Sequence, residues 1–267
     1  MNSVVLPDGS VKGLGHLPPN RPCKLKAFKD AVPNPQLTNS EILTLINDPN
    51  RTSRRVLFGD TWIQQGNQGQ YGSCNGWALA SAASKIRYLG GLTDGMVLSG
   101  SYTYSKMNGG SDNGSSLSDD IDVLETYGAP PASVVTASMI YPRLQPENAD
   151  QLAAQHKGLV MYSCETQQEV LSAIALGFPV VVCLQVAGQW ENFSGTGILP
   201  SYSGQGNHAI HADGLVYQGG QFLLDCCNNW GLNWGDNGRA LASWSSFAQP
   251  IESEPFIVVA SISEGGQ

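Results

Sequence analysis

The chain has 267 residues, of which 41% are hydrophobic and only 13% charged, and its formal net charge is −8. This length suits one large domain or two tightly joined halves with a substantial core. No run of 18 apolar residues occurs, and the N-terminus lacks a basic region followed by an apolar stretch, so we expect no membrane span and no secretory signal. A cytoplasmic or particle-associated location is therefore expected. The acidic balance also argues against nucleic acid as a partner, because that binding needs Lys and Arg to neutralise phosphates.

The N-terminal residues 1–58 form a leader that differs from the rest. Residues 1–55 carry eight Lys and Arg against four Asp and Glu, whereas the remainder is strongly acidic. Turn-forming stretches such as LPPNRP and AVPNPQ predict a mainly irregular segment. One helix is expected after Thr38 or Ser40, where Ile42, Leu45 and Ile46 share a face. The opposite charges predict a leader that lies along the acidic body, with Cys23, Leu25, Phe28 and the Ile42–Ile46 face as apolar anchors.

Three helices and then several strands are predicted beyond residue 59. The first helix begins at Cys74, with Ser73 as candidate N-cap, and ends at a Gly-Gly pair. The second reads SDDIDVLETYG with Ser118 as its cap, and the third begins with a capping box of Thr166 and Glu169. The segments PVVVCLQVAG, NHAIHADGLVYQ and GQFLLDCC are short runs typical of strands. Helices followed by strands predict an α+β protein whose two halves meet at a cleft.

Cys74 is either a packed apolar residue or a nucleophile. A thiol at a helix N-terminus is favoured as the thiolate by the amides and the dipole there, and we expect it to face solvent. The even number of cysteines permits disulfides, but without a secretory signal or CxxC spacing for zinc we expect free thiols and no metal. The six are Cys23, Cys74, Cys164, Cys183, Cys226 and Cys227.

A nucleophilic thiol needs a base and a group that orients the base. Of the four histidines, His16 and His156 lie in irregular or polar stretches and are expected to be solvated. His208 begins an apolar strand and is the candidate base. His211 falls on the opposite side of that strand, which favours a supporting or surface role. Asn228 ends another strand and would fix the imidazole tautomer by a hydrogen bond, although the NNWGLNWGDNG stretch alone is equally compatible with a β-turn holding two core tryptophans.

Three motifs in order, QGQYGSC (68–74), NHA (207–209) and NNWGLNWGDNG (228–238), resemble those of the papain family of cysteine peptidases. The resemblance covers roughly residues 59–267. It implies a papain-like two-lobed fold, mainly helical over about 59–158 and β-barrel-like over about 159–267, with the active-site cleft between the halves. It implies no cofactor.

The resemblance also implies roles for individual residues. Cys74 would be the nucleophile, His208 the general base and then acid, Asn228 the orienting residue and Gln68 the side-chain oxyanion donor. Trp230 would cover the Asn228–His208 bond. Substrate-binding positions are implied at Ser73, Gly114, Ser115, Cys183, Ala209 and Trp230, with Cys183 and Ala209 lining the pocket for the second residue before the cleaved bond.

The departures from the family pattern leave the four catalytic groups in place. Tyr71 stands where the family has a disulfide cysteine, Asn75 replaces the tryptophan after the nucleophile, and Asn229 replaces a serine. Ser115 and Ser116 replace part of a glycine-rich stretch along the cleft. Bacterial and viral members are the most similar in these respects.

The function predicted is a cysteine peptidase acting on peptide or protein substrates through a Cys74 thioester. Two alternatives stay open: a papain-fold structural or interaction protein, in a viral or other assembly, whose site is vestigial or occluded, and an acyl transferase or amidase using the same Cys–His pair. The leader is interpreted as a reduced propeptide, a docking arm for an assembly, or a structural brace. The brace is favoured, because no stretch of the leader is visibly suited to the cleft.

Overall fold

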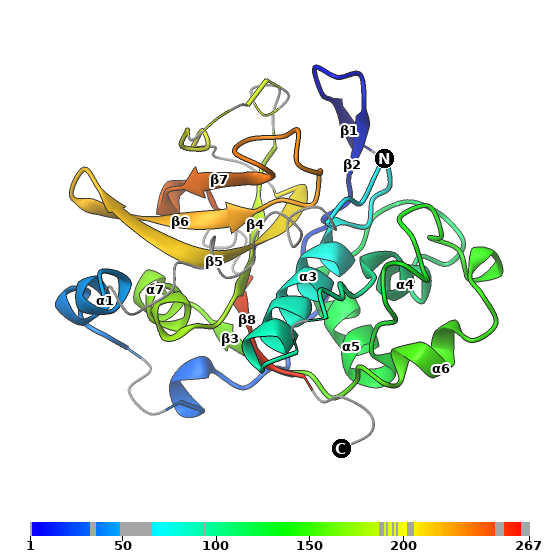
Figure 1. The fold of residues 1–267 in the computed structure, drawn as a ribbon, viewed down its shortest axis with the longest axis horizontal. Coiled ribbons are helices and arrows are strands. Elements are labelled where there is room, and N and C mark those ends of the chain that lie inside the picture. Colours follow the sequence, from blue (N-terminus) through cyan, green and yellow to red (C-terminus); the bar gives the residue numbers. More distant parts are fainter. Residues whose placement is uncertain are drawn as a thin grey trace.

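The computed structural model describes residues 2–32, 36–48, 66–92, 94–186, 190, 192–193, 195, 197–201, 206–248 and 254–262. The predicted boundary at Gly59 lies outside these residues. Figure 1 shows one twisted sheet with helices on both sides. The class is α+β, as predicted, with most of the helices on one side of the cleft and the sheet on the other.

The sheet has six strands, and every neighbouring pair is antiparallel. Their order across the sheet is β3-β8-β4-β5-β6-β7. Within the described residues β3 and β7 remain the two edges, so the sheet does not close into a barrel. The strands are β3 (Val160–Cys164), β4 (Val180–Leu184), β5 (His208–Gln218), β6 (Gln221–Cys227), β7 (Arg239–Ala242) and β8 (Phe256–Ser261).

Helix α3 (Cys74–Leu89) lies between the sheet and the other helices of its half (Figure 1). It is rich in alanine and buried over nearly its whole length, because the sheet covers one side and α4 (Gly100–Ser105) and α5 (Leu117–Tyr127) cover another. Gly100 allows the close crossing of α3 and α4, since a Cβ there would lie 2.3 Å from the backbone nitrogen of Trp77. Helix α6 (Ala149–Ala153) completes this half.

Helices α1 (Asn39–Ile46) and α7 (Gln167–Leu176) pack together against the opposite face of the sheet. Both begin with a capping box, at Thr38 and at the predicted Thr166. The caps of the other two predicted helices differ from expectation. Ser73 makes no side-chain capping bond to α3, and α5 begins after Ser116 rather than Ser118. Short 3-10 helices occur at Phe28–Asp30, Pro142–Leu144 and Trp244–Ser246.

The leader is more regular than predicted. A β-hairpin of β1 (Asn2–Val5) and β2 (Val11–Leu14) projects beside the loop that precedes α3 (Figure 1). Further along, Phe28 and Ile42 are fully buried in the core under α7. Arg21 pairs with Asp119 and Asp122 on α5, the kind of contact expected between a basic leader and an acidic body. Exposed pairs of this kind contribute little, so the apolar anchors carry most of the docking.

Candidate active site

The loop over residues 66–73 carries Gln68 to the start of α3, where Cys74 is the first helical residue. This loop is tied to the other half of the protein. The Gln68 backbone nitrogen donates to the Asn229 carbonyl at 2.9 Å, and Asn67 forms a β-bridge with Trp230. The link explains how segments far apart in sequence, the Gln68–Cys74 loop and the turn after Asn228, meet at one place.

The imidazole of His208 lies against Asn228 and Trp230. His208 Nε2 is 2.9 Å from Asn228 Oδ1, and the same oxygen accepts the Asn229 backbone amide at 2.8 Å. The Trp230 ring covers the imidazole with 4.7 Å between ring centroids, and the Trp190 ring is nearly perpendicular to the imidazole with 6.3 Å between centroids. An Asn oxygen at Nε2 leaves Nδ1 to exchange a proton. That second nitrogen is buried and has no hydrogen-bond partner among the residues that the structure describes.

Cys74 packs against the strand that carries His208, since it shares a buried cluster with Ala209, the residue after the histidine. The backbone amides of Ala209 and Gly15 act on the Cys74 thiol and lower its pKa. The four residues of the predicted catalytic set are therefore gathered around the N-terminus of α3. All four are almost fully buried.

Leader residues 13–17, which we call the cleft segment, run between the two halves of the protein. On the helical side, the Gly15 carbonyl accepts the Ser115 amide and the Leu17 amide donates to the Ser115 carbonyl, both at 2.8 Å. On the sheet side, the His16 amide donates to the Asn207 carbonyl at 3.1 Å. The cleft segment therefore binds by its backbone to both walls. The expectation that no stretch of the leader suits the cleft is wrong.

Two glycines let the cleft segment lie this close. A Cβ on Gly15 would come within 1.9 Å of the Gly72 carbonyl oxygen, and one on Gly13 within 2.3 Å of the Tyr71 carbonyl oxygen. Gln68 Nε2 donates to the Gly13 carbonyl at 3.0 Å and to the Tyr71 carbonyl at 2.9 Å. The side chain assigned to the oxyanion thus already holds a peptide carbonyl of the leader.

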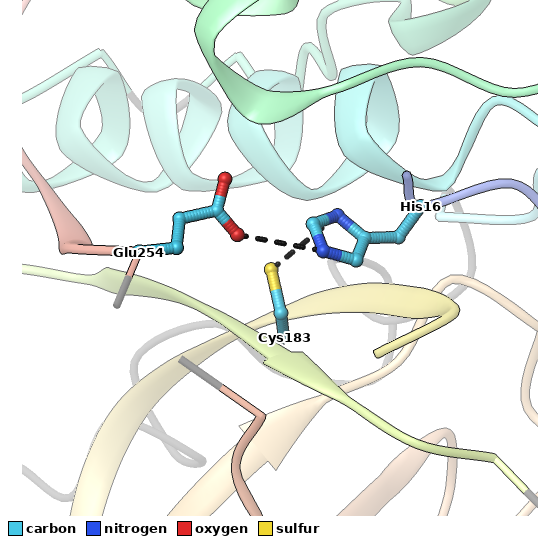
Figure 2. Close-up of side chains that lie close together, drawn as sticks. All are labelled: His16, Cys183 and Glu254. Carbon is cyan, nitrogen blue, oxygen red and sulfur yellow. Dashed lines mark hydrogen bonds and ion pairs between the residues drawn. The ribbon is translucent and has the colours of Figure 1, made fainter. Parts of the chain in front are cut away.

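His16 is buried in this arrangement, with an exposed fraction of 3%, and the prediction that it is solvated is wrong. Its Nδ1 lies 3.1 Å from Asn75 Oδ1. The same nitrogen lies 3.6 Å from Cys183 Sγ, and Nε2 lies 3.4 Å from Glu254 Oε2 (Figure 2). Histidine, cysteine and glutamate are also zinc ligands, and these three offer atoms within 4.8 Å of one another. In the structure Cys183 Sγ approaches the Nδ1 side of the ring and Glu254 Oε2 lies within ion-pair distance of Nε2.

The predicted substrate-binding residues lie along the same cleft. Ser115 binds the cleft segment through its backbone. Gly114 has φ +90°, and a Cβ at this position would lie only 2.3 Å from the Gly15 carbonyl oxygen, so no larger residue fits there. Cys183 and Ala209 are directly paired across β4 and β5, and both are fully buried. Ser73 and Trp230 are buried at the margins of the catalytic set.

Burial under the cleft segment reverses the expected ionisation of the catalytic pair. Desolvation raises the pKa of Cys74 to about 11, even though the amides of Ala209, Gly15 and Asn75 lower it. Desolvation also lowers the pKa of His208 to about 4, against the raising effect of its bond to Asn228. In this form the pair is a neutral thiol and a neutral imidazole. The predicted solvent-facing thiolate is therefore wrong for the protein with its leader in place.

Two buried polar groups near the site carry no clear signal in the sequence. Glu254 is nearly at the C-terminus and 6% exposed. Asp120 on α5 is fully buried, accepts a 2.6 Å hydrogen bond from Ser115 Oγ, and has its pKa raised to about 7, chiefly by burial. Asp120 lies in the first turn of α5, where a solvated acid is the ordinary expectation.

The other two histidines are both buried, so the prediction that His156 is solvated is also wrong. His211 has a supporting position rather than a surface one. It lies 3.8 Å from Asp213, whose carboxylate also pairs with Lys85 and Arg239 in a buried network behind α3. All six cysteines are free, in agreement with the reduced state predicted from the sequence.

The fold and the grouping of Cys74 with His208 and Asn228 define the papain-like class of α+β proteins. A model of the papain family of cysteine proteases matches residues 62–247, and the chain belongs to this family. No curated protein matches the chain. Several solved structures share the fold at low sequence identity.

One of these structures is xylellain, a cysteine protease from Xylella fastidiosa, with a TM-score of 0.67, 19% identity, and coverage of 94% of this chain and 96% of that one. A second is procathepsin L 3 of the Tenebrio molitor larval midgut, with a TM-score of 0.57, 19% identity, and coverage of 74% and 66%. A third is bromelain from Ananas comosus in complex with the E64 inhibitor, with a TM-score of 0.55, 17% identity, and coverage of 73% and 92%. At these identities the likeness supports the fold. No helix in the described part of the chain is long and apolar enough to cross a membrane.

Proposed function

We propose that the protein is a cysteine peptidase that hydrolyses peptide bonds and that the form described here is latent, with the cleft segment in the substrate's place. The observation that carries the proposal is the bond from Gln68 Nε2 to the Gly13 carbonyl. A donor that binds a peptide carbonyl beside a cysteine at a helix N-terminus is the arrangement that acyl transfer from a peptide requires.

The reaction proceeds in two halves once the cleft is open. Cys74 Sγ attacks the carbonyl carbon of the substrate while its proton passes to His208 Nδ1, and the oxygen gains a negative charge. Gln68 Nε2 and the Cys74 backbone amide donate to that oxygen. The C–N bond then breaks, the amine leaves with the proton from His208, and a thioester remains on Cys74. Water attacks the thioester and gives a proton to His208. The C–S bond then breaks, the carboxylic acid is released, and Cys74 Sγ recovers its proton from His208.

Asn228 and Trp230 act through the imidazole. The Asn228 oxygen at Nε2 fixes the ring so that Nδ1 is the nitrogen that exchanges protons. Trp230 and Trp190 exclude water from that bond. Because an amide carries no charge, it orients the histidine without holding it permanently protonated.

The second candidate is an interaction or structural protein whose site stays occluded. It is favoured by the full burial of Cys74 and by the backbone bonds of the cleft segment to both walls. The two candidates differ in what happens when the leader is displaced. A peptidase gains turnover, whereas an occluded structural protein gains only exposed surface.

The test uses the full chain with the substitution Gly15→Ala. The added methyl group would clash with the Gly72 carbonyl oxygen, so it should displace the cleft segment from the site. Cleavage of a peptide library is measured for this variant, for wild type, and for Gly15→Ala combined with Cys74→Ala. We expect turnover in Gly15→Ala that is at least tenfold above wild type and is lost with Cys74→Ala. Adding Gln68→Ala should lower kcat by about a hundredfold, the usual effect of losing one oxyanion donor. Turnover that survives Cys74→Ala would exclude the proposed nucleophile, and a folded, open variant without turnover would support the structural candidate.

A further inference from the structure

Three metal-binding side chains from distant parts of the chain meet where the leader crosses the cleft. They are His16 of the cleft segment, Cys183 on β4 and Glu254 just before β8 (Figure 2). Each offers a ligand atom, and these atoms lie within 4.8 Å of one another. Among the residues that the structure describes, this is the only group of three His, Cys, Asp or Glu side chains placed to share one metal ion. We call it the His16 cluster.

The chemistry of the three side chains selects the type of ion. An imidazole, a thiolate and a carboxylate together suit zinc, whereas magnesium and calcium prefer oxygen ligands. The thiolate and the carboxylate each bring one negative charge, so a divalent ion makes the site neutral. Neutrality matters because all three side chains are buried, where an uncompensated charge is costly. The His16 cluster therefore matches Zn²⁺ in both ligand type and charge.

Asn75 holds the imidazole in the form that a metal needs. Its amide nitrogen donates to the Ser115 carbonyl at 2.7 Å, so its oxygen is the atom that faces His16 Nδ1, at 3.1 Å. An amide oxygen only accepts hydrogen bonds, so the hydrogen is on Nδ1 and the lone pair is on Nε2. Nε2 is the nitrogen on the side of Glu254, 3.4 Å from Oε2. Histidine ligands of metals commonly donate their other ring N–H to an oxygen in this way.

The dimensions of the His16 cluster are close to those of a zinc site. Zinc–ligand distances of about 2.0–2.3 Å place the ligand atoms of a tetrahedral site about 3.3–3.6 Å apart. The 3.4 Å between Nε2 and Glu254 Oε2 already fits, and Cys183 Sγ lies 3.6 Å from Nδ1 of the same ring. At its widest the set exceeds a zinc site by no more than about 1 Å, which rotation of the glutamate and cysteine side chains can close. A water molecule would take the fourth position.

The position of the His16 cluster gives a bound ion a defined role. His16 belongs to the leader, whereas Cys183 and Glu254 belong to the sheet side of the cleft. Glu254 also lines an open hollow of about 430 Å³ beside leader residues 19–23, through which an ion can reach the cluster from solvent. An ion bound by all three side chains ties the leader to this wall. At a free zinc concentration one hundred times the Kd, the ratio of seated to displaced leader rises about a hundredfold.

We propose that His16, Cys183 and Glu254 form a zinc site that locks the leader in the cleft. The proposal does not depend on the peptidase function, since the same site would form in an occluded structural protein. In a peptidase, removal of zinc would be a step toward activation, because it frees the cleft segment to leave Cys74. The ligands lie far apart in the sequence, so no short-range spacing marks the site, and the expectation from the sequence was that no metal binds.

The first experiment measures the site in full-length Cys74→Ala protein, which lacks the catalytic thiol as a competing ligand. Titration calorimetry should show one Zn²⁺ per chain with a Kd below about 1 µM. Co²⁺ in its place should give a thiolate charge-transfer band, and X-ray absorption of the zinc form should show one sulfur ligand at about 2.3 Å. A Kd weaker than about 100 µM, or zinc bound without a sulfur ligand, would overturn the proposal.

Substitutions then identify the residues that hold the ion. In the same protein, His16→Gln, Cys183→Ser and Glu254→Gln should each raise the zinc Kd by about a hundredfold or more. Cys23→Ser is the matched control, because Cys23 is a half-buried thiol of the leader outside the cluster, and it should leave the Kd unchanged. His16→Cys keeps a ligand in the leader and should change the site from one sulfur to two, an outcome that loss of folding cannot imitate. Zinc binding that survives all three ligand substitutions, or a single sulfur in His16→Cys, refutes the site.

The last experiment measures whether the ion holds the leader. The amides of His16 and Leu17 are hydrogen-bonded in the seated leader, and their hydrogen exchange is followed in Cys74→Ala protein with zinc and with a chelator. Zinc should slow this exchange by about tenfold or more, and His16→Gln should abolish the effect. In the wild-type protein, the chelator should raise the rate of Cys74 alkylation by a similar factor. Equal exchange with and without zinc, in protein that binds the ion, would refute the lock.

Discussion

Replacing Gly15 by alanine should convert Cys74 from an inert thiol to a reactive one. In the wild-type protein, burial raises the pKa of Cys74 to about 11, against an ordinary value of 9.0. At pH 8 the thiolate fraction is therefore about one in a thousand, compared with about one in ten for an ordinary thiol. The alanine Cβ would lie 1.9 Å from the Gly72 carbonyl oxygen, a contact that the seated cleft segment cannot accept.

The expected gain in the rate of alkylation at pH 8 is about a hundredfold, because the thiolate is the reacting form and its fraction changes by that factor. The assay follows iodoacetamide modification of Cys74 by mass spectrometry as a function of pH, with the other five cysteines as internal references. Val5→Ala, at an exposed position of the leader hairpin, is the control and should react as wild type does. Wild-type labelling with an apparent pKa below 9, or equal rates for Gly15→Ala and wild type, would refute the account of a thiol silenced by the leader.

Three further predictions concern stability. Asp120 has its folded pKa raised to about 7 from an ordinary 3.8, so its neutral form contributes stability that is complete below pH 3.8 and lost as the pH rises to about 7. Chemical denaturation should show Asp120→Asn gaining about 4 kcal/mol relative to wild type between pH 4 and pH 7.5, and a constant difference would contradict the assignment. Asp213→Asn should lower the free energy of unfolding by about 3–5 kcal/mol, because it leaves Lys85 and Arg239 buried with less negative charge beside them. The control is Asp30→Asn at an exposed position, which should change the free energy of unfolding by less than about 0.5 kcal/mol. Gly100→Ala should cost about 1–3 kcal/mol by forcing α3 and α4 apart, and an unchanged melting temperature would show that the crossing can relax.

Local signals predicted many of the elements well. The capping box at Thr166 and the helix after Thr38 depend on contacts within four residues, so they could be inferred from a short stretch of sequence. The strands β4, β5 and β6 follow from runs of buried side chains bounded by glycine and asparagine. The predicted cap of α5 differs from the observed one by two residues because Ser115, Ser116 and Ser118, which lie within four positions, offer the same chemistry.

The candidate catalytic set could likewise be predicted from the sequence, since Gln68, Cys74, His208 and Asn228 lie in motifs whose order and spacing are specific. The pocket beside them, which holds His16, could not be predicted. His16 and Glu254 come from opposite ends of the chain, and neither has neighbours that distinguish it from a solvated residue. Asp120 is similar, since its burial depends on how α5 packs under Ser115.

The sequence by itself determined the family, the α+β class and the candidate nucleophile, because these depend on local patterns and on a short list of chemically required residues. Only the tertiary structure decided that the leader enters the cleft, that Cys74 and His208 are uncharged beneath it, and that His16 meets Glu254. The physical reason is that burial is a property of the whole fold. A helix N-terminus favours a thiolate in water, but the cost of desolvating the charge outweighs that preference once Gly13 to Leu17 lie across the site.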